Sequence, residues 1–389
     1  MKILHIIDHI YPILGYQETF LAKSHSVNHE TLVISSNTHS KSIYDANKNL
    51  LKSEMIKSGI SIEQGLKILR LPIKFDIMLF NSPWLIGLEK EVENFKPDLI
   101  IAHGLVNISS IRLAMKKSKL KNTALVFDDH MTYNASRWGW TSLFYKFFKI
   151  LFTPLFLKSA SAFVAVTPET KAFMHNIYGI PNERINIIPL GFSQDNFRKD
   201  LEVRNLVRKN YGIPSNATVL IYAGKIISQK GVHLFVDAAI QLAKSNKNLF
   251  FMIVGGSEPS YLAALKKKVA NANMNNLFVF LDAVPNQELF KYYNAADIGV
   301  WPLQCSVTML EATACGLPAI ISDKCGATER VAAGNGLLYS ESNPADLANK
   351  IVSLLNPELR AYMSQKATAY ARNLCWDRLS ALFLEISKK

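Results

Sequence analysis

Cysteine, glycine, proline and long apolar runs are all scarce in this chain of 389 residues. The four cysteines, at positions 305, 315, 325 and 375, are too few for a disulfide framework, and no two are spaced as CxxC, which argues against a zinc site. A reducing cytoplasm fits this cysteine content. Glycine (18) and proline (15) are too few for a fibrous or low-complexity protein.

Long apolar runs are also missing. No uncharged stretch reaches the roughly 20 residues of a transmembrane helix; residues 143–157 come nearest and contain Lys146 and Lys149. The N-terminal sequence MKILHIIDHIYP has a short apolar run broken by polar residues and lacks the features of a secretory signal. We therefore expect a cytoplasmic protein, either soluble or attached to the inner face of the cytoplasmic membrane.

Apolar residues make up 49% of the chain and charged residues 19%, which is enough apolar content to fill full-sized cores. Short apolar strands alternate with helical stretches, a pattern typical of parallel sheets covered on both faces. The expected strands are residues 2–7, 31–35, 97–103, 124–127, 162–166 and 185–188, followed by 219–222, 250–254, 277–281, 298–301 and 319–322. Ligands of such sheets bind at the carboxyl ends of the strands.

The strand pattern restarts after Pro189-Leu190-Gly191, which carries turn residues. The predicted fold class is therefore α/β, with two Rossmann-like doubly wound domains facing each other across a cleft. We expect the first domain at 1–190, the second at 191–370, and a helix at 371–389 that crosses back to the first domain.

The sequence GKIISQKG, which follows the strand at 219–222, combines glycines with Lys225 and Lys230 at the start of a helix. Helix N-terminal amides and two lysines suit a pyrophosphate. The loop is not a Walker A motif, because GxxxxGK[ST] is absent. An ordinary solvated turn is the alternative interpretation.

A carboxylate, Glu311, lies in the sequence MLEATACGLPAIIS. We expect it to begin a short helix that ends at Gly316, where it could accept two hydrogen bonds from a ribose diol. The alternative is an acid that merely interacts with the helix dipole.

These segments, taken in order, resemble the retaining glycosyltransferases of family 4, the glycosyl transferases group 1, which have the GT-B fold. The resemblance runs from about Lys2 to Leu384. It rests on GKIISQKG, FMIVGG, FVFLDAVPNQELFKYYNAADIGVWP, LEATACGLPAIIS and Cys375-Trp376-Asp377.

The resemblance implies a nucleotide-sugar donor as substrate, with no metal or cofactor. Lys225 and Lys230 would neutralise the donor diphosphate, and Glu311 would hold the ribose. The family's first acid should stand at 303, where this chain has leucine; Gln304 or Ser306 could take over its contacts with the sugar. The implied donor-binding residues are Gly15, Gly191, Lys225, Lys230, Gly255, Val284, Gln304, Ser306, Val307 and Glu311.

In the first half, the same resemblance implies a role for His130 beside the reacting sugar carbon, which completes the catalytic set with Lys225 and Lys230. An imidazole satisfied by Asp128 or Asp129 is the alternative. His103 and Tyr16 are placed on the acceptor side.

Excess positive charge is concentrated between Arg112 and Lys158, a stretch that contains nine Lys or Arg residues and two Asp residues. The basic and aromatic stretch at 138–158 is typical of a helix at an anionic membrane surface, or of a buried helix whose lysines reach solvent. No nucleic-acid-binding module is present. The predicted membrane contacts are Trp138, Trp140, Phe144, Lys146, Phe147, Phe148 and Lys149.

The sequence therefore predicts a metal-independent retaining glycosyltransferase that moves a sugar from a UDP-sugar, rather than a GDP-sugar, to a hydroxyl of a glycan or lipid-linked acceptor. Assembly of a bacterial surface polysaccharide or glycolipid is the expected setting. The alternatives are a non-catalytic GT-B partner subunit and a nucleotide-sugar epimerase.

Overall fold

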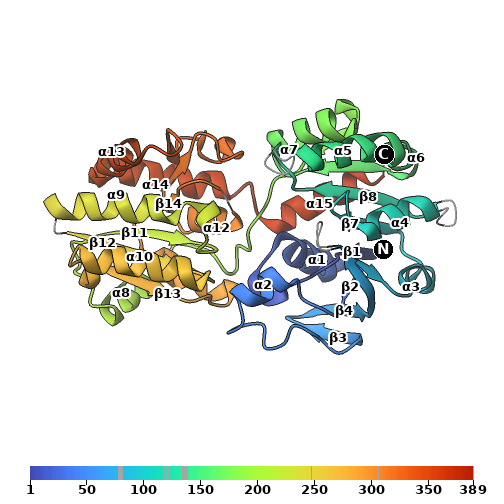
Figure 1. Cartoon of the computed structure of the whole chain (residues 1–389), viewed down its shortest axis with the longest axis horizontal. Coiled ribbons are helices and arrows are strands. Elements are labelled where there is room, and N and C mark those ends of the chain that lie inside the picture. Colours follow the sequence, from blue (N-terminus) through green and yellow to red (C-terminus); the bar gives the residue numbers. More distant parts are fainter. Residues whose placement is uncertain are drawn as a thin grey trace. The chain divides into compact units, whose positions relative to one another are not determined.

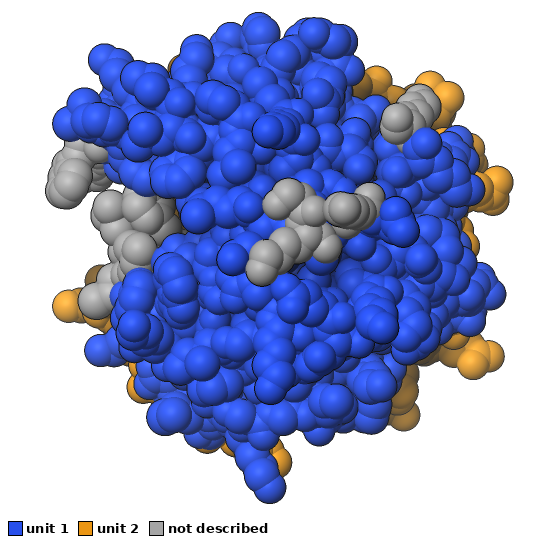
Figure 2. All heavy atoms as spheres, turned by 90° about the vertical axis from the view of Figure 1, so that its right-hand side faces the viewer, with its two compact units in different colours: residues 1–44, 53–190, 376–389 blue, residues 45–52, 191–375 orange. Residues whose placement is uncertain are grey.

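The structure, a computed structural model of the chain, describes residues 1–77, 82–117, 120, 122–133, 139–246, 248–304 and 306–388. The chain forms two compact units, which are coloured separately in Figure 2. Unit 1 comprises residues 1–44, 53–190 and 376–389, and unit 2 comprises residues 45–52 and 191–375. Each unit is an α/β structure built on one large sheet (Figure 1).

The eight-stranded sheet of unit 1 has the order β10-β9-β8-β7-β1-β2-β4-β3, and only the β3–β4 pair is antiparallel. The inner strands of this sheet are almost wholly buried, as expected for a parallel sheet covered on both faces, whereas the edge strand β3 is mostly exposed. Two further strands, β5 and β6, form a separate antiparallel pair. The strands are β1 (Lys2–Ile6), β2 (Glu30–Ser36), β3 (Gly59–Glu63), β4 (Leu66–Leu71), β5 (Ile73–Ile77), β6 (Ser82–Leu85), β7 (Leu99–His103), β8 (Ala124–Asp129), β9 (Ala162–Ala165) and β10 (Ile185–Ile187).

The helices of unit 1 cover this sheet and come from both ends of the chain. The C-terminal helix α15 packs against α1, where Phe20 stacks on Trp376 and Ser24 bonds to Ser380 at 2.8 Å. The helices are α1 (Gln17–Asn28), α2 (Lys41–Ala46, whose last two residues belong to unit 2), α3 (Leu88–Phe95), α4 (Ile108–Lys116), α5 (Gly139–Leu151), α6 (Thr153–Ser159), α7 (Pro168–Phe173) and α15 (Trp376–Ile386).

The sheet of unit 2 is fully parallel, with the order β13-β12-β11-β14-β15-β16. Three of its helices begin at side-chain caps: Asp200, Asn343 and Asn356 accept backbone N–H groups in the first turn of α8, α13 and α14, respectively. The strands are β11 (Thr218–Ala223), β12 (Leu249–Val254), β13 (Phe278–Leu281), β14 (Ile298–Trp301), β15 (Ala319–Ser322) and β16 (Gly336–Tyr339). The helices are α8 (Leu201–Asn210), α9 (Val232–Ser245), α10 (Pro259–Asn271), α11 (Leu289–Ala295), α12 (Val307–Ala314), α13 (Pro344–Leu355) and α14 (Pro357–Ala371).

Short helical turns complete both units. They are η1 (Pro12–Leu14), η4 (Met174–Tyr178), η5 (Asn182–Arg184), η6 (Ser228–Lys230), η7 (Asn275–Leu277), η8 (Asn286–Glu288) and η9 (Thr328–Val331).

The pattern of strands and helices differs from the expected one at several places. Strands β3, β4, β5, β6 and β16 were not among the predicted strands. The β3–β4 hairpin turns at Gln64-Gly65, where both residues have positive φ, as the tight turns of hairpins require. Residues 45–52, expected in the first domain, group with unit 2, and the C-terminal helix begins at Trp376 rather than at 371.

Candidate functional site

Two glycine loops meet at the carboxyl ends of neighbouring strands in unit 2. Gly224 follows β11 and Gly255 follows β12, and a Cβ on Gly255 would lie 1.9 Å from the carbonyl oxygen of Gly224. Gly255 also has φ +150°, which L side chains rarely adopt. Ser306 Oγ is 3.8 Å from the position of a Cβ on Gly224. The loops after β11, β12 and β14 therefore come together, and glycine is required for their close approach.

Lys225 and Lys230 lie in the loop between β11 and α9. Lys225 is half-buried; burial and the nearby charge of Lys230 lower its pKa to about 8. No salt bridge to Lys225 is present among the described residues. Gly231, in the left-handed conformation, leads directly into α9. Two close lysines at a helix N-terminus form an environment that favours a bound anion.

Glu311 does not begin its helix, contrary to our expectation, and the helix ends at Ala314 rather than at Gly316. Glu311 is the fifth residue of α12 and is fully buried. Asn286 Nδ2 donates to its Oε1 at 2.7 Å, and the Tyr293 hydroxyl donates to its Oε2 at 3.3 Å. Burial raises the pKa of Glu311 to about 8 despite these two hydrogen bonds. Neither donor was predicted from the sequence. Asn286 lies shortly after β13, and polar residues that follow a strand are candidates for a ligand site.

The loop between β14 and α12 holds the position of the missing acid. Leu303 packs on the start of α9, because a Cβ on Gly231 would lie 2.5 Å from its Cγ. Ser306 Oγ is 2.5 Å from Thr308 Oγ1, which donates to the carbonyl of Ala223 at 2.7 Å. An apolar side chain therefore lies against the helix start, and hydroxyls line the end of β11.

The other predicted donor-side residues also occupy loops. Gln304 and Val284 are half-buried, and Val307 is the first residue of α12. Next to Val284, the carbonyl of Ala283 accepts a hydrogen bond from Asn49 Nδ2 at 2.7 Å, within unit 2. Gly191 is the first residue of the long segment of unit 2.

In unit 1, the predicted residues follow β1, β7 and β8. Gly15 has φ +69° at the end of η1, and Tyr16 is the N-cap residue of α1. His130 is exposed, and its ring makes no hydrogen bond to Asp128 or Asp129 among the described residues, although it lies close enough to interact electrostatically with both carboxyls. Asp129 Oδ1 instead accepts the backbone N–H of His130 at 2.7 Å.

His103 is buried, and both of its ring nitrogens have protein partners. Nδ1 lies 2.7 Å from Asp128 Oδ2, and Nε2 lies 3.1 Å from His5 Nδ1. His5 Nε2 then lies 3.1 Å from His25 Nδ1, and His25 Nε2 lies 3.2 Å from the carbonyl of Ser380.

The proton positions in this chain follow from its last acceptor. A carbonyl only accepts, so His25 carries its proton on Nε2 and His5 also carries its proton on Nε2. His103 then donates from Nε2 to His5, and with Asp128 ionised it also donates from Nδ1 to that carboxylate, as an imidazolium. The pKa directions agree: burial opposes both charges, yet the pair raises the pKa of His103 and lowers that of Asp128. Asp128 Oδ1 is buried and has no hydrogen-bond partner among the residues that the structure describes, a feature that was not predicted from the sequence.

Helix α5 divides the predicted membrane contacts into two groups. Phe148 is buried in the core of unit 1 and Phe144 packs partly against that core, so the assignment of Phe148 to a surface was wrong. Lys146, Phe147 and Lys149 are exposed. Trp138 and the side chain of Trp140 lie outside the described residues. No helix in the described part of the chain is long and apolar enough to cross a bilayer.

Comparison with known sequences matches both halves of the chain to glycosyltransferase families. Residues 29–195 match Glycosyltransferase Family 4, and residues 203–370 match Glycosyl transferases group 1. The chain belongs to glycosyltransferase family 4.

Curated relatives of this family 4 protein include the D-inositol 3-phosphate glycosyltransferase of Acidothermus cellulolyticus. The two are 30% identical over 216 residues, which cover 52% of this chain and 47% of the relative. The matched region thus spans about half the length of the curated relatives.

Solved structures share the fold over the whole chain. Sucrose-phosphate synthase from Thermosynechococcus elongatus has a TM-score of 0.75 at 17% identity, covering 100% of this chain and 98% of that one. HepE of Anabaena, in complex with UDP and glucose, has a TM-score of 0.75 at 19% identity, covering 99% and 98%. The family 4 protein therefore has the GT-B fold.

Proposed function

We propose that the protein transfers a sugar from a nucleotide diphosphate sugar to a hydroxyl of a glycan or lipid-linked acceptor. The observation that carries the proposal is the half-buried Lys225, which has no salt bridge among the described residues and lies close enough to Lys230 for its pKa to be lowered. Burial and the charge of Lys230 disfavour the charged form of Lys225, and a diphosphate at the start of α9 would offset both effects.

A UDP-sugar is the proposed donor. HepE, which shares the fold, forms complexes with UDP and with UDP-glucose. In this chain the base would contact the loop at Ala283-Val284, and the ribose would bond to Glu311. Asn286 joins these two places, because it follows Val284 closely and donates to Glu311.

The chemistry proposed for the site is electrostatic. As the bond between sugar and diphosphate breaks, negative charge grows on the phosphate, and Lys225, Lys230 and the amides of α9 stabilise it. These groups take the part that a metal ion plays in other transferases. We propose that the configuration of the sugar is retained, that the leaving phosphate helps to deprotonate the acceptor, and that His130 contacts the reacting sugar.

The proposed acceptor is held by unit 1 near a membrane surface. Helix α5 exposes Leu143, Phe147, Ile150 and Leu151 at 56%, 56%, 71% and 62% of their surface, beside Lys146. Neither α5 nor α6 contains an acidic residue. An apolar helix face bordered by lysines fits the interface of an anionic membrane, where the chain would meet a lipid-linked acceptor during surface polysaccharide or glycolipid assembly.

Nucleotide-sugar binding is the test of this proposal. Thermal stabilisation of the purified protein is measured with UDP-sugars, GDP-sugars and the free nucleotides, because a specific ligand stabilises by mass action. We expect one UDP-sugar to exceed UDP, to be hydrolysed slowly to UDP, and to lose its effect in Lys230→Ala but not in the exposed control Lys244→Ala.

Two other results would overturn the proposal. Binding without hydrolysis or transfer would favour a non-catalytic partner subunit. The apolar Leu303, at the position of the missing acid, is consistent with such a subunit. Conversion of the free nucleotide sugar into its epimer would identify an epimerase.

A further inference from the structure

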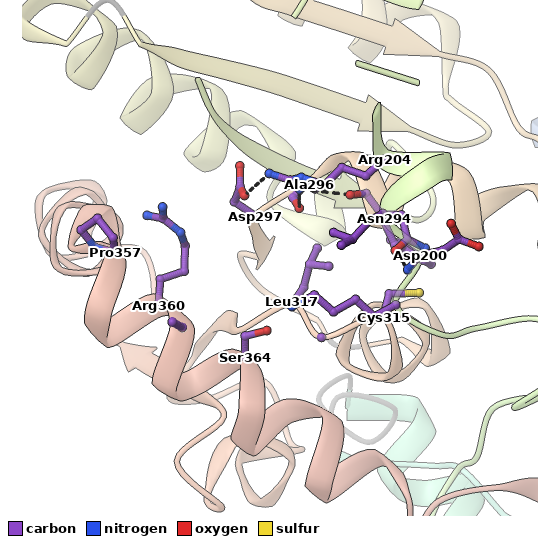
Figure 3. A pocket seen from close by; sticks show the side chains of 15 residues that line it. Asp200, Arg204, Asn294, Ala296, Asp297, Cys315, Leu317, Pro357, Arg360 and Ser364 are labelled. Atoms are coloured by element: carbon purple, nitrogen blue, oxygen red, sulfur yellow. Dashed lines mark hydrogen bonds and ion pairs between the residues drawn. The ribbon is translucent and has the colours of Figure 1, made fainter. Parts of the chain in front are cut away.

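A cavity of about 300 Å³ opens at the opposite edge of the unit 2 sheet from the glycine loops. It lies beside Asp297, which precedes β14, and Leu317, which precedes β15, so it faces the amino-terminal ends of these strands (Figure 3). The segment before α8, the end of α11 and the first turns of α14 form its walls. Nothing in the proposed transfer reaction uses this cavity.

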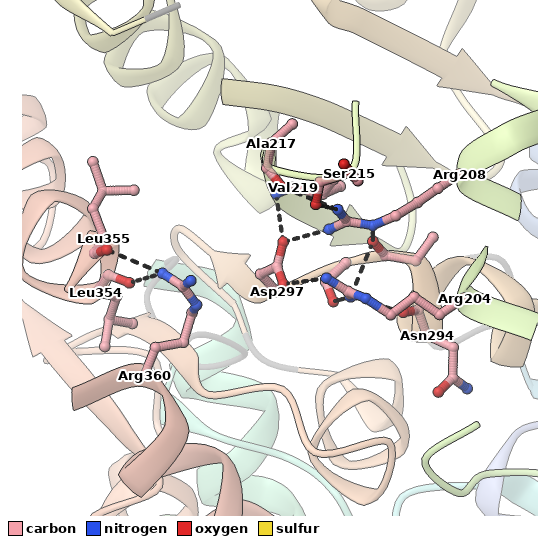
Figure 4. A network of polar contacts seen from close by, with 12 residues as sticks. Arg204, Arg208, Ser215, Ala217, Val219, Asn294, Asp297, Leu354, Leu355 and Arg360 are labelled. Carbon is pink, nitrogen blue, oxygen red and sulfur yellow. Dashed lines mark hydrogen bonds and ion pairs between the residues drawn. The ribbon is translucent and has the colours of Figure 1, made fainter. Parts of the chain in front are cut away.

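The acidic residue at the floor of the cavity is already neutralised. Asp297 accepts hydrogen bonds from Arg204 Nη2 at 2.7 Å and Arg208 Nη2 at 2.6 Å, and also from the backbone N–H of Val219 at 2.8 Å (Figure 4). Two guanidinium groups thus face one carboxylate. Burial, together with the charges of Arg204 and Arg360, lowers the pKa of Arg208, although Asp297 opposes this effect. Arg208 does not itself line the cavity, but it leaves Asp297 compensated by two guanidinium groups, so this carboxylate does not hold the floor negative.

Three donors on the walls retain hydrogen-bonding capacity. Arg360 donates from Nη1 to the carbonyls of Leu354 and Leu355, and its Nε and Nη2 have no partner among the described residues. The ammonium of Lys199 and the hydroxyl of Ser364 likewise have no partner there. The remaining carboxylate, Asp200, is engaged by the backbone N–H groups of Glu202 and Val203 at the start of α8.

A glycine keeps the space between two of these donors open. Gly316 has φ +85°, and a Cβ at this position would lie 3.2 Å from Ser364 Oγ and 3.7 Å from Lys199 Cδ. The lysine stem and the serine hydroxyl therefore converge on the same point of the wall. A larger residue at 316 would fill part of the cavity.

We propose that this cavity binds a small phosphate monoester, at a site separate from the nucleotide site. A phosphate monoester carries nearly two negative charges at neutral pH and several acceptor oxygens, which match a guanidinium, an ammonium and a hydroxyl. The volume lies at the lower end of the range for ligand pockets, so the fitting ligand is of hexose-phosphate size rather than a dinucleotide.

Calorimetric titration of the full-length protein with glucose 6-phosphate as the probe tests the proposal. We expect saturable binding that weakens about tenfold in Lys199→Ala and in Arg360→Gln, because each variant removes a charged hydrogen-bond donor. Lys366→Ala, an exposed position of α14 outside the cavity, is the matched control and should bind like the wild type. Because Lys199 is exposed, its replacement does not threaten folding.

A second variant separates this site from the nucleotide site. Lys230→Ala should bind the probe normally while losing UDP. The absence of saturable probe binding to the wild type would overturn the proposal, and so would loss of probe binding in Lys230→Ala with retention in Lys199→Ala. Failure of UDP to bind would count against the proposed function alone.

Discussion

Asn286 donates its side-chain amide to Glu311 Oε1 at 2.7 Å, and both residues are buried in unit 2. The bond joins the loop after β13 to the middle of α12. The Glu311 carboxyl is thereby held in a fixed position next to the loop where the nucleobase is proposed to lie. Because Tyr293 approaches its other oxygen at 3.3 Å, this acid is oriented by neutral donors rather than by a cation.

Replacing Glu311 with glutamine should make the unfolding free energy less dependent on pH. The folded pKa of about 8 lies above the ordinary value of 4.5, so burial of this group costs more stability as pH rises from about 4.5 to about 8. The difference in unfolding free energy between Glu311→Gln and the wild type should shift in favour of the variant by a few kcal/mol from pH 5 to pH 8. Urea unfolding at both pH values measures this, with the exposed Glu358→Gln as control; parallel pH profiles would contradict the argument.

Nucleotide affinity should fall at alkaline pH because Lys225 loses its charge. The pKa of Lys225 is lowered to about 8 in the free protein, so between pH 7 and pH 9 the affinity for UDP should drop about tenfold. Lys225→Arg keeps its charge and should show no such drop, whereas the exposed Lys244→Arg should behave like the wild type. Calorimetry across this range decides; an equal drop in Lys225→Arg would remove Lys225 from the site.

Asp128→Asn should destabilise unit 1 by about 3 kcal/mol, because it leaves the His103 imidazolium without its counter-charge. The contribution of His103 is complete below its ordinary pKa of 6.5 and is lost as pH rises through its raised value. That of Asp128 is present above 3.8 and is lost as pH falls through its lowered value. The effect is therefore largest between about pH 4 and pH 6.5.

Nitrogen NMR of the histidine rings provides an independent readout of the same pair. At pH 6 His103 should be doubly protonated, and His5 and His25 should be neutral with the proton on Nε2. A neutral His103 at this pH would contradict the ion pair with Asp128, and a proton on Nδ1 of His5 or His25 would contradict the order derived from the Ser380 carbonyl. For the unfolding measurement on Asp128→Asn, the control is Asp195→Asn, which removes an exposed carboxylate.

Binding to anionic vesicles should depend on the exposed face of α5. Sedimentation with vesicles of phosphatidylglycerol and phosphatidylcholine should retain the wild type, and Phe147→Ser with Ile150→Ser should weaken retention by about tenfold or more, since two large apolar side chains are lost. Leu206→Ser, an equally exposed apolar position on α8, is the matched control. Equal retention of all three proteins would exclude α5 as the contact.

The sequence alone predicted the alternation of strands and helices, the restart near residue 190, and the lysine-bearing loop that opens a helix. These features are local, since strand and helix periodicity and glycine spacing are written within a few residues of one another. The same local order carried the resemblance to family 4. The β3–β4 hairpin was not predicted, because its turn is Gln-Gly, which is a weaker hairpin signal than Asn-Gly or Asp-Gly.

Only the tertiary structure decided which distant groups meet. The chain His25–His5–His103–Asp128 joins residues from α1, β1, β7 and β8 to a carbonyl on α15, and the carboxyl of the buried Glu311 is held by Asn286 and Tyr293. The cavity beside Asp297 likewise needs α8, α11 and α14 to pack side by side. Sequence spacing reports the residues on one element, whereas burial and charge pairing depend on contacts between elements far apart in the chain, and these set the pKa of each group and the space left open.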